Sequence, residues 1–480
     1  MSSPSVEIRA SVPNRTLTVA ALLLSMFMAA MEATVVATAM PTVVADLGGI
    51  SLYGWVGASY LLASTVTVPL YGKLADRGGR KPVLLIGIAL FLAGSLASGL
   101  ARTIEQLIFF RALQGLGAGA VQPIVLTVIG DLYQPSERGR VQGFFGAIWG
   151  MAGIAGPLLG GAIVHALSWR WVFLVNLPPG LAAMAVLAVA FREPERPRGG
   201  APLDLAGATV ITLASLALLL AASSFAPVIM ACAGVALTVL FVFVEKRARD
   251  PVVPMPLLSR RLIAVTTIAS LLLGAAMMGS LNFLPLHVQG VLGGMPTEAG
   301  LVIAPMLVGW PIASAATSRL LTRVGYRRPV WLGSAITTIS LLLLAPLVVA
   351  RAPAWTLGAA MGLFGVGMGL VNTAIIIGVQ ASVGWEQRGV ATATNMFART
   401  MGGALGVGGL GAILAQRLDR VLSNDVASAL LDPHRRAAAI AQPGVIEALG
   451  NALDPLFWCG GVATAATMAA LFFYPRDSST

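Results

Sequence analysis

Long apolar runs recur along almost the whole chain, and they limit the fold more than any other feature. Each run reaches about 20 residues, which is enough to cross a bilayer as an α-helix. Only 11% of the 480 residues are charged and 57% are hydrophobic, whereas a soluble domain carries about 25% charged residues. The runs lack the alternation of a membrane β-barrel, and an open sheet cannot satisfy its backbone in lipid. The sequence therefore predicts an all-α polytopic membrane protein.

Fourteen segments have the length and composition of a membrane span. The stretch from 205 to 245 could instead be one helix of about 40 residues, but that is twice the length that one span needs. Ser223, Ser224 and Pro227 offer a turn near its middle, which favours two helices. We expect spans at 16–43, 52–72, 82–101, 105–130, 140–166, 170–191, 205–222, 226–245, 262–288, 298–320, 329–349, 354–380, 388–414 and 454–474.

Clusters of Arg and Lys in the short loops predict how these spans are oriented. If 205–245 forms two helices, the clusters fall on one side of the membrane, which the positive-inside rule assigns to the cytoplasm. Both termini are then cytoplasmic, and a long loop at about 416–453 lies outside. The basic residues that give the net charge of +11 lie mostly in these loops. The sequence has no basic repeat with interleaved aromatic residues, which is the pattern that would indicate nucleic-acid binding. We expect a protein of the cytoplasmic membrane that contacts lipid and binds no nucleic acid.

One acidic residue, Glu32, lies inside the apolar stretch from Thr16 to Val44. A carboxylate at the bilayer centre costs about 2.5–3.5 kcal/mol on the translocon scale, so such a residue is a functional-site hypothesis by default. A carboxylate whose hydration changes between two conformations can take a proton on one side and release it on the other. Two alternatives remain open. Glu32 could be a structural partner of Arg111, or it could contact a cationic substrate directly.

The fourth expected span contains the segment RALQGLGAGAVQP. Its polar residues Arg111, Gln114 and Gln122 fall near one helical face at about 100° per residue. A cation inside a membrane helix should face the bundle interior or a cavity. We interpret Arg111 as a functional residue; the alternative is that it holds a neighbouring carbonyl group or Asp side chain.

The loop after the second expected span reads GKLADRGGRK, residues 72–81. Asp76 can pair with the arginines or with a neighbouring helix end, and the basic residues can reach lipid phosphates. The loop could also be a simple positive-inside segment. A weaker copy, SRLLTRVGYRR at 318–328, follows the tenth expected span and has Thr322 in place of Asp76. Its position indicates an internal repeat.

The fifth expected span contains GAIWGMAGIAGPLLGG, in which glycines recur at close spacing. Small residues let membrane helices approach closely, and a proline can kink the span. We therefore predict a packing seam and a hinge, with Gly150, Gly156, Pro157 and Gly160 as its main residues.

These motifs resemble those of the major facilitator superfamily. The loop at 72–81 resembles the signature loop of that superfamily, and the glycine-proline stretch resembles the motif of its antiporters. Three further stretches are similar to the fourteen-span drug–proton antiporter family. The segment Glu32-Ala33-Thr34-Val35-Val36 keeps the frame in which that family usually carries an Asp. The three stretches are SWRWVFLVNLPPG (168–180), LPLHVQGVLGGMPTEAG (284–300) and NMFARTMGGALG (395–406).

The resemblance implies both a fold and residue roles. It implies the major facilitator fold, with six-helix bundles at 1–192 and 262–480 and a linker at 193–261 that carries two additional central transmembrane helices. It implies proton coupling through Glu32 and Arg111. It also implies a conformational switch in the loop, formed by Gly72, Asp76, Arg77, Gly79, Arg80 and Lys81.

Other polar and aromatic residues in the expected spans are candidates for a substrate cavity. Asn395 and Arg399 lie one turn apart in the thirteenth span, and the packing of a glycine-rich helix would explain them equally well. We interpret His287, near the outer end of its span, as interfacial. The cavity candidates are Gln114, Gln122, Trp149, Asn282, Phe283, Trp310, Asn372, Asn395 and Arg399.

Together these features predict a proton-coupled antiporter that exports amphipathic or lipophilic, cationic drugs by alternating access and so confers antibiotic resistance. No Gly-rich stretch ends in Gly-Lys-Ser/Thr, so we expect the proton gradient as energy source, with no cofactor, metal or catalytic residue and no enzyme activity. We expect a monomer. The only lysines are Lys73, Lys81 and Lys246, which favours a bacterial source. The alternatives are an exporter of an endogenous lipid or secondary metabolite and a non-transporting scaffold or receptor.

Overall fold

The computed structural model describes residues 14–47, 53–133, 135–193, 204–222, 227–248, 251–294, 296–420, 442 and 444–475. These residues form α-helices, one 3-10 turn and short connecting segments, and they contain no β-strand. The helices are α1 (Arg15–Leu47), α2 (Tyr53–Gly78), α3 (Arg80–Gly99), α4 (Ile104–Leu132), α5 (Pro135–Ala166), α6 (Arg170–Leu174), α7 (Leu177–Ala190), α8 (Leu205–Ala222), α9 (Pro227–Arg247), α10 (Met255–Ser259), α11 (Arg261–Gly290), α12 (Pro296–Val324), α13 (Arg327–Val349), α14 (Ala354–Ala381), the 3-10 turn η2 (Trp385–Gln387), α15 (Arg388–Asp419) and α18 (Val445–Leu471).

Each expected span coincides with helix in the described part of the chain, so the all-α prediction is confirmed there. Ten stretches of helix in the described ranges are long and apolar enough to cross a membrane. The shorter apolar helix within α8 covers residues 206–221. The count of fourteen spans stays a prediction.

Three features differ from the prediction. The segment predicted as a loop at 72–81 is helical except at Gly79, because α2 continues to Gly78 and α3 begins at Arg80. The sixth expected span, 170–191, is broken, because α6 ends at Leu174 and α7 begins at Leu177 with prolines in its first turn. Proline is well suited to a helix start and cannot continue a helix that precedes it. The outer loop predicted at 416–453 is shorter than expected, because α15 continues to Asp419 and α18 already begins at Val445. Residues 421–441 and 443, which fall in that loop, lie outside the described residues.

The chain packs as two compact units. Unit 1 comprises Met1–Ala208, Arg247–Pro254 and Gln380–Thr394, and unit 2 comprises Thr209–Lys246, Met255–Val379 and Asn395–Thr480. The predicted division into 1–192, 193–261 and 262–480 stays a prediction. The packing adds a feature that this division lacks, since the end of α14 and the first turns of α15 belong to unit 1.

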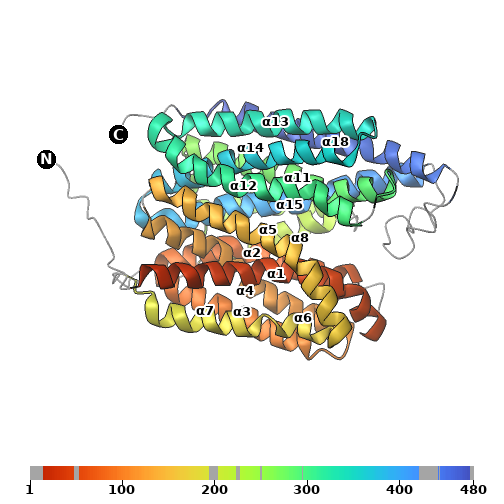
Figure 1. Cartoon of the computed structure of the whole chain (residues 1–480). Helices are drawn as coiled ribbons and strands as arrows, with labels where there is room; N and C mark the ends of the chain where they lie inside the picture. The colour runs from red at the N-terminus through yellow and green to blue at the C-terminus, as the bar shows by residue number, and fades with distance from the viewer. Residues whose placement is uncertain are drawn as a thin grey trace. The chain divides into compact units, whose positions relative to one another are not determined.

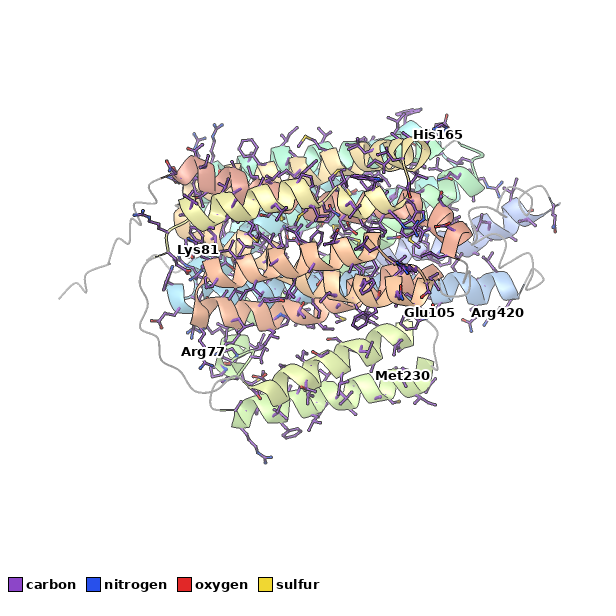
Figure 2. The ribbon with its side chains drawn as sticks, turned by 90° about the horizontal axis from the view of Figure 1, so that it is seen from below. Arg77, Lys81, Glu105, His165, Met230 and Arg420 are labelled. Carbon is purple, nitrogen blue, oxygen red and sulfur yellow. The ribbon has the colours of Figure 1, made fainter. Side chains whose placement is uncertain are left out.

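Within unit 1, α4 packs between α2 and α3, and α1 packs against α5 and α7. Figure 1 shows α1, α3, α4 and α7 side by side. Arg77 and Lys81 lie at one end of these helices, whereas Glu105 and His165 lie at the other, as Figure 2 shows. Within unit 2, α18 packs against both α11 and α13 (Figure 1).

Glycine patterns inside the two units support the predicted internal repeat. The central helix of unit 1, α4, carries GLGAG at 115–119, and α14 of unit 2 carries GVGMG at 365–369. A Cβ atom at Gly115 would lie 2.4 Å from a carbonyl oxygen of α2, and one at Gly365 would lie 2.4 Å from a carbonyl oxygen of α12. In both motifs the middle glycine faces the next helix, α3 or α13. Each pattern therefore packs one helix tightly against two neighbours.

Candidate functional site

Glu32 lies on α1, where 1% of its surface is exposed, and its carboxylate is held from two sides. The guanidinium of Arg111 on α4 forms an ion pair with Oε1 and donates a hydrogen bond to it. The side-chain amide of Asn176 donates to Oε2. A buried charge is tolerable only when it is paired and hydrogen-bonded, and both oxygens of Glu32 meet that condition.

Arg111 is fixed by three further groups. Its Nη1 donates to Gln114 Oε1 at 2.7 Å, one turn along the same helix. Its Nε donates to the carbonyl oxygen of Val56 on α2 at 3.4 Å. The guanidinium also lies 4.3 Å from the ring centroid of Tyr60, a cation–π distance. The predicted pair of Glu32 and Arg111 is therefore brought together, with α2 as a third support.

Ser95 on α3 connects the remaining members of this cluster. Its hydroxyl accepts hydrogen bonds from Gln114 Nε2 and Asn176 Nδ2, each at 3.2 Å, and donates to the carbonyl oxygen of Phe173 at 2.8 Å. Both Ser95 and Asn176 are buried. We call Glu32, Ser95, Arg111, Gln114 and Asn176 the buried polar network. Its side chains come from α1, α3, α4 and the break between α6 and α7.

Sequence reasoning did not select Ser95 or Asn176. Asn176 lies in the break between α6 and α7, at the position that precedes the first turn of α7. The signal that points to it is Asn-Leu-Pro-Pro at 176–179, because two prolines force a helix start inside an apolar run and free the side chain before them. Ser95 carries no such signal, since a serine in an apolar helix usually bonds its own backbone.

The network can respond to a single proton. In the structure the carboxylate of Glu32 and the guanidinium of Arg111 compensate each other's charge. Protonation of Glu32 would leave the cation with neutral acceptors only, from Gln114 and Val56. Charge-assisted hydrogen bonds are roughly twice as strong as neutral ones, so this change would weaken the link between α1 and α4.

Two cavity candidates lie outside this network. Gln122 shares a helical face with Arg111, but 11 residues of α-helix separate them by about 16 Å along the axis. Trp149 on α5 is 36% exposed. No hydrogen bond joins either residue to the five network side chains in the described part of unit 1.

Asp76, near the end of α2, binds the first turn of α15. Its two carboxylate oxygens accept hydrogen bonds from the backbone N–H groups of Gly389 at 2.9 Å and Val390 at 2.7 Å. The start of a helix carries unpaired N–H groups and a partial positive charge, so a carboxylate is favourable there. Arg80 also forms an ion pair with Asp76 at 3.4 Å. Both partners suggested by the sequence, an arginine and a helix end, are therefore present.

Arg80 is the most deeply buried charged residue of the segment 72–81, with 1% of its surface exposed. Its Nε lies 2.6 Å from the carboxylate of Asp131 at the end of α4, and Nη2 donates to the carbonyl oxygen of Trp385 at 3.0 Å. Asp131 also pairs with Arg388 at 3.2 Å. We call Asp76, Arg80, Asp131 and Arg388 the charge cluster. Its acidic and basic members outside 72–81 were not selected from the sequence.

The rest of the predicted switch loop supports this cluster. Gly72 packs so closely that a Cβ atom there would lie 2.4 Å from Ala393 of α15. Gly79 has φ +99°, a conformation that favours glycine, and it immediately precedes α3. The equivalent Gly325 has φ +76° before α13, which supports the repeat. Lys81 donates to the carbonyl oxygen of Ala188 at 2.6 Å, and Arg77 lies in the last turn of α2 (Figure 2).

Three of the cavity candidates in unit 2 take part in two hydrogen-bonded pairs, which we call the second polar group. Arg399 on α15 donates from Nη1 to Asn372 Oδ1 of α14 at 3.2 Å. Asn395, one turn earlier on α15, accepts a hydrogen bond at 2.7 Å from Ser270 of α11 through its Oδ1. The remaining candidates in unit 2 are separate from this group: Asn282 is exposed and bonds its own helix, Phe283 is buried and Trp310 is partly buried.

Comparison with known proteins decides the family. A model of the Major Facilitator Superfamily matches residues 22–407. The chain belongs to the Major Facilitator Superfamily.

Relatives in this superfamily include two transporters of Bacillus subtilis (strain 168). The chain is 35% identical to "Multidrug transporter protein MdtP" over 419 residues, which cover 85% of this chain and 77% of that protein. It is also 35% identical to "Multidrug resistance protein 3" over 395 residues, or 80% of this chain and 77% of that protein. The fold is similar to that of the proton:xylose symporter XylE, with a TM-score of 0.64 and 14% identity over 96% of this chain and 95% of XylE.

These matches confirm several predictions. The chain is a multi-pass membrane protein with the major facilitator fold, and it is a transporter homologous to multidrug efflux pumps. It belongs to a family of transporters and not of enzymes.

The predicted hinge of this transporter lies within α5. Gly150, Gly156 and Gly160 are buried, which fits a packing seam. Pro157 is part of the same continuous helix, and its side chain lies outside what the structure describes. A hinge at this place stays a prediction.

The interpretation of His287 as interfacial is wrong. His287 is fully buried on α11, and its ring lies edge-on to Phe457 of α18 with 6.2 Å between the ring centroids. Neither ring nitrogen has a hydrogen-bond partner in the described part of the chain. The position near the end of the span suggested an interface, but α18 packs along this side of α11 and covers the ring, which the sequence of α11 does not reveal.

Proposed function

We propose that this transporter is a proton-coupled antiporter of the fourteen-span drug–proton type. It exports amphipathic, lipophilic compounds across the cytoplasmic membrane by alternating access, and both termini lie in the cytoplasm. The observation that carries the proposal is the buried pair of Glu32 and Arg111. The names of the two Bacillus subtilis relatives, a multidrug transporter and a multidrug resistance protein, support the class of cargo.

In this proposal Glu32 is the coupling acid. When Glu32 is ionised, it holds Arg111 and Asn176 as the structure shows. When it takes a proton from the outside, the guanidinium loses its charged acceptor, and the helices that carry the two residues can move apart. Release of the proton on the cytoplasmic side restores the pair. A purely structural pair would give no reason to place two ionisable residues in apolar helices, where each is costly.

The charge cluster acts as a conformational switch in the same cycle. Asp76 holds the first turn of α15, so any movement of α15 against α2 must break two hydrogen bonds to a carboxylate. Hydrogen bonds to a charged group contribute about 1.5–3 kcal/mol each. A contact of this size favours one conformation and can still be broken during a transport cycle.

The decisive test is transport by Glu32→Gln in proteoliposomes. Purified full-length protein is reconstituted with a pH indicator inside the vesicles, a pH gradient is imposed, and amphipathic dyes that carry a positive charge, no charge or a negative charge are added in turn. Wild-type protein should dissipate the gradient faster when a transported dye is present. In Glu32→Gln this dye-dependent proton flux should fall by about tenfold or more. Glu137→Gln is the matched control, because Glu137 is an exposed partner of Arg15.

Two outcomes would reject the proposal. Wild-type protein that moves no dye and no proton under any gradient would exclude an antiporter. Glu32→Gln that couples dye export to protons as wild type does would exclude Glu32 as the coupling acid.

A further inference from the structure

Among the described residues, Arg399 is a cation without a counter-charge. It lies on α15 and is partly buried, and its one hydrogen bond in the described part of the chain goes to a neutral amide, Asn372 Oδ1. No described carboxylate lies within 4.0 Å of it, whereas Arg111 of unit 1 has Glu32. A cation inside a membrane helix normally pairs with an anion or faces a cavity. The missing partner is therefore a feature that needs an explanation.

The side chains around Arg399 offer hydrogen-bond donors and have few free acceptors. Arginine has five N–H donors, and one is in use here. The Oδ1 of Asn372 accepts from Arg399, and the Oδ1 of Asn395 accepts from Ser270. The Nδ2 of Asn395 is buried and has no hydrogen-bond partner among the described residues. Asn395 and Arg399 stand at i and i+4 on one helix, so their free donors lie on the same face.

Close packing of α11 against α15 fixes this arrangement. A Cβ atom at Gly274 of α11 would lie 2.0 Å from the backbone carbonyl oxygen of Arg399, and one at Gly402 would lie 1.9 Å from a carbonyl oxygen of α11. Neither helix can rotate or slide there without a clash. The donors of Asn395 and Arg399 are thus held in place before any ligand arrives, which lowers the entropy lost on binding.

We infer that Arg399 and Asn395 bind an anionic oxygen group of the cargo, such as a carboxylate. The inference rests on the proposed function and specifies its substrates as amphipathic compounds with an acidic group. It departs from the expectation of a cationic cargo, because Glu32 is already neutralised by Arg111 and leaves Arg399 as the charge that a substrate can complement. A planar guanidinium can hold both oxygens of a carboxylate at once, which an ammonium group cannot.

The test is the binding of three dansyl probes that differ in charge. Dansylglycine carries a carboxylate, its amide is neutral, and dansylcadaverine carries an ammonium group. Binding to purified full-length protein in detergent is followed by fluorescence, without any pH gradient. Wild-type protein should bind dansylglycine about tenfold or more tightly than the amide, the range expected for a charge-assisted hydrogen bond. Dansylcadaverine should bind more weakly than the amide.

Three variants separate charge from folding. Arg399→Gln should lose most of the preference for the carboxylate and bind the amide within about twofold of wild type. Asn395→Asp places a carboxylate within reach of Arg399, so it should be well folded, lose the preference and gain affinity for dansylcadaverine. Arg261→Gln, which removes an exposed guanidinium of the same unit, should keep the preference.

The inference is overturned if wild-type protein shows no preference for the carboxylate, or if Asn395→Asp keeps it. An anionic lipid is the competing source of the same oxygen group. If one equivalent of phosphatidylglycerol displaces dansylglycine from wild-type protein, the anion is a lipid phosphate and the assignment to cargo is wrong. If Arg399→Gln does not fold, Asn395→Asp still decides. Because no gradient is used, a failure of proton coupling leaves this result unchanged.

Discussion

Asp76 accepts a hydrogen bond at 2.7 Å from the backbone N–H of Val390, a residue 314 positions later in the chain. The contact joins the end of α2 to the first turn of α15 inside one compact unit. It gives a physical reason for the acidic residue in the otherwise basic segment 72–81. A helix start attracts a carboxylate, and Arg80 beside it keeps the local charge balanced.

Asp76→Asn should slow transport more than it weakens substrate binding. Asparagine can accept one of the two backbone hydrogen bonds, but its amide group would face the other N–H and it has no charge. We expect the turnover rate to fall by about tenfold, the effect of losing one charge-assisted hydrogen bond. Initial rates of dye transport in proteoliposomes, together with dye affinity in detergent, check this. An unchanged rate with weaker affinity would contradict a switch role.

Asp76 should also make stability depend on pH. Burial raises the pKa of Asp76 to about 7, against the opposing effects of Arg80 and the N–H groups of α15, and Asp131 nearby raises it further. Because this pKa exceeds the ordinary value of 3.8, folding favours the protonated acid. The resulting stability is fully present below pH 3.8 and is lost as pH rises through about 7.

The thermal unfolding midpoint of the wild-type protein should therefore fall between pH 5 and pH 8, a range that spans the raised pKa of Asp76. The slope contributed by this one group is at most about 1.4 kcal/mol per pH unit. Asp76→Asn should flatten it. Asp46→Asn is a suitable control, because hydrogen bonds from Trp169 and Arg170 lower the pKa of that exposed carboxylate and its effect lies at more acidic pH. Equal slopes in wild type and Asp76→Asn would contradict the assignment.

The buried polar network should show non-additive mutations. Ser95 accepts from both Gln114 and Asn176, so Ser95→Ala and Asn176→Ala remove overlapping interactions. We expect each single variant to cost about 1–3 kcal/mol, since each leaves a buried group without a partner. The double variant should cost less than the sum by about 0.5–3 kcal/mol. Unfolding free energies of the four proteins give this difference, and simple additivity would mean that the network does not act as one unit.

Much of the fold could be predicted from the sequence, because the length of an apolar run fixes a membrane helix by itself. Helix ends were predicted less well where proline was involved. Pro178 and Pro179 break the sixth expected span, whereas α18 runs through Pro455 from a start at Val445. In one case proline begins a helix and in the other it lies inside one, and the local sequence does not distinguish the two.

The candidate sites were predicted in part. Glu32, Arg111 and Asp76 are recognisable because charges in apolar or glycine-rich segments are rare. Asn176 bonds Glu32, Ser95 bonds Asn176, and Asp131 and Trp385 contact Arg80. These partners come from other parts of the chain, and only the packing brings them close. That no described carboxylate pairs with Arg399 could not be predicted either, because it depends on what every neighbouring helix presents to that residue.

The close packing of α15 against α11 at Gly402 predicts different effects for two similar variants. A methyl group at Gly402 would lie 1.9 Å from the carbonyl oxygen of Leu271, whereas one at Gly409 on the same helix meets nothing within 4 Å. Gly402→Ala should therefore lower stability by about 1–3 kcal/mol through overpacking, and Gly409→Ala should not. The same change should weaken dansylglycine binding, because it moves α15 away from α11. Equal melting temperatures for the two variants would show that the helices do not pack as closely as described.

The hinge of α5 can be tested with the same kind of pair. Gly156 is buried, whereas Gly161 has no atom within 4 Å of the place where a Cβ atom would stand. If α5 bends at this glycine-proline step during transport, Gly156→Ala should reduce the turnover rate several-fold while dye affinity stays within about twofold, because alanine disfavours the bent backbone and fills the seam. Gly161→Ala adds the same methyl group and the same helix propensity without touching a neighbour. It should transport as wild type does. A loss of affinity at unchanged turnover in Gly156→Ala would assign the glycine to packing around the substrate and exclude a hinge at this position.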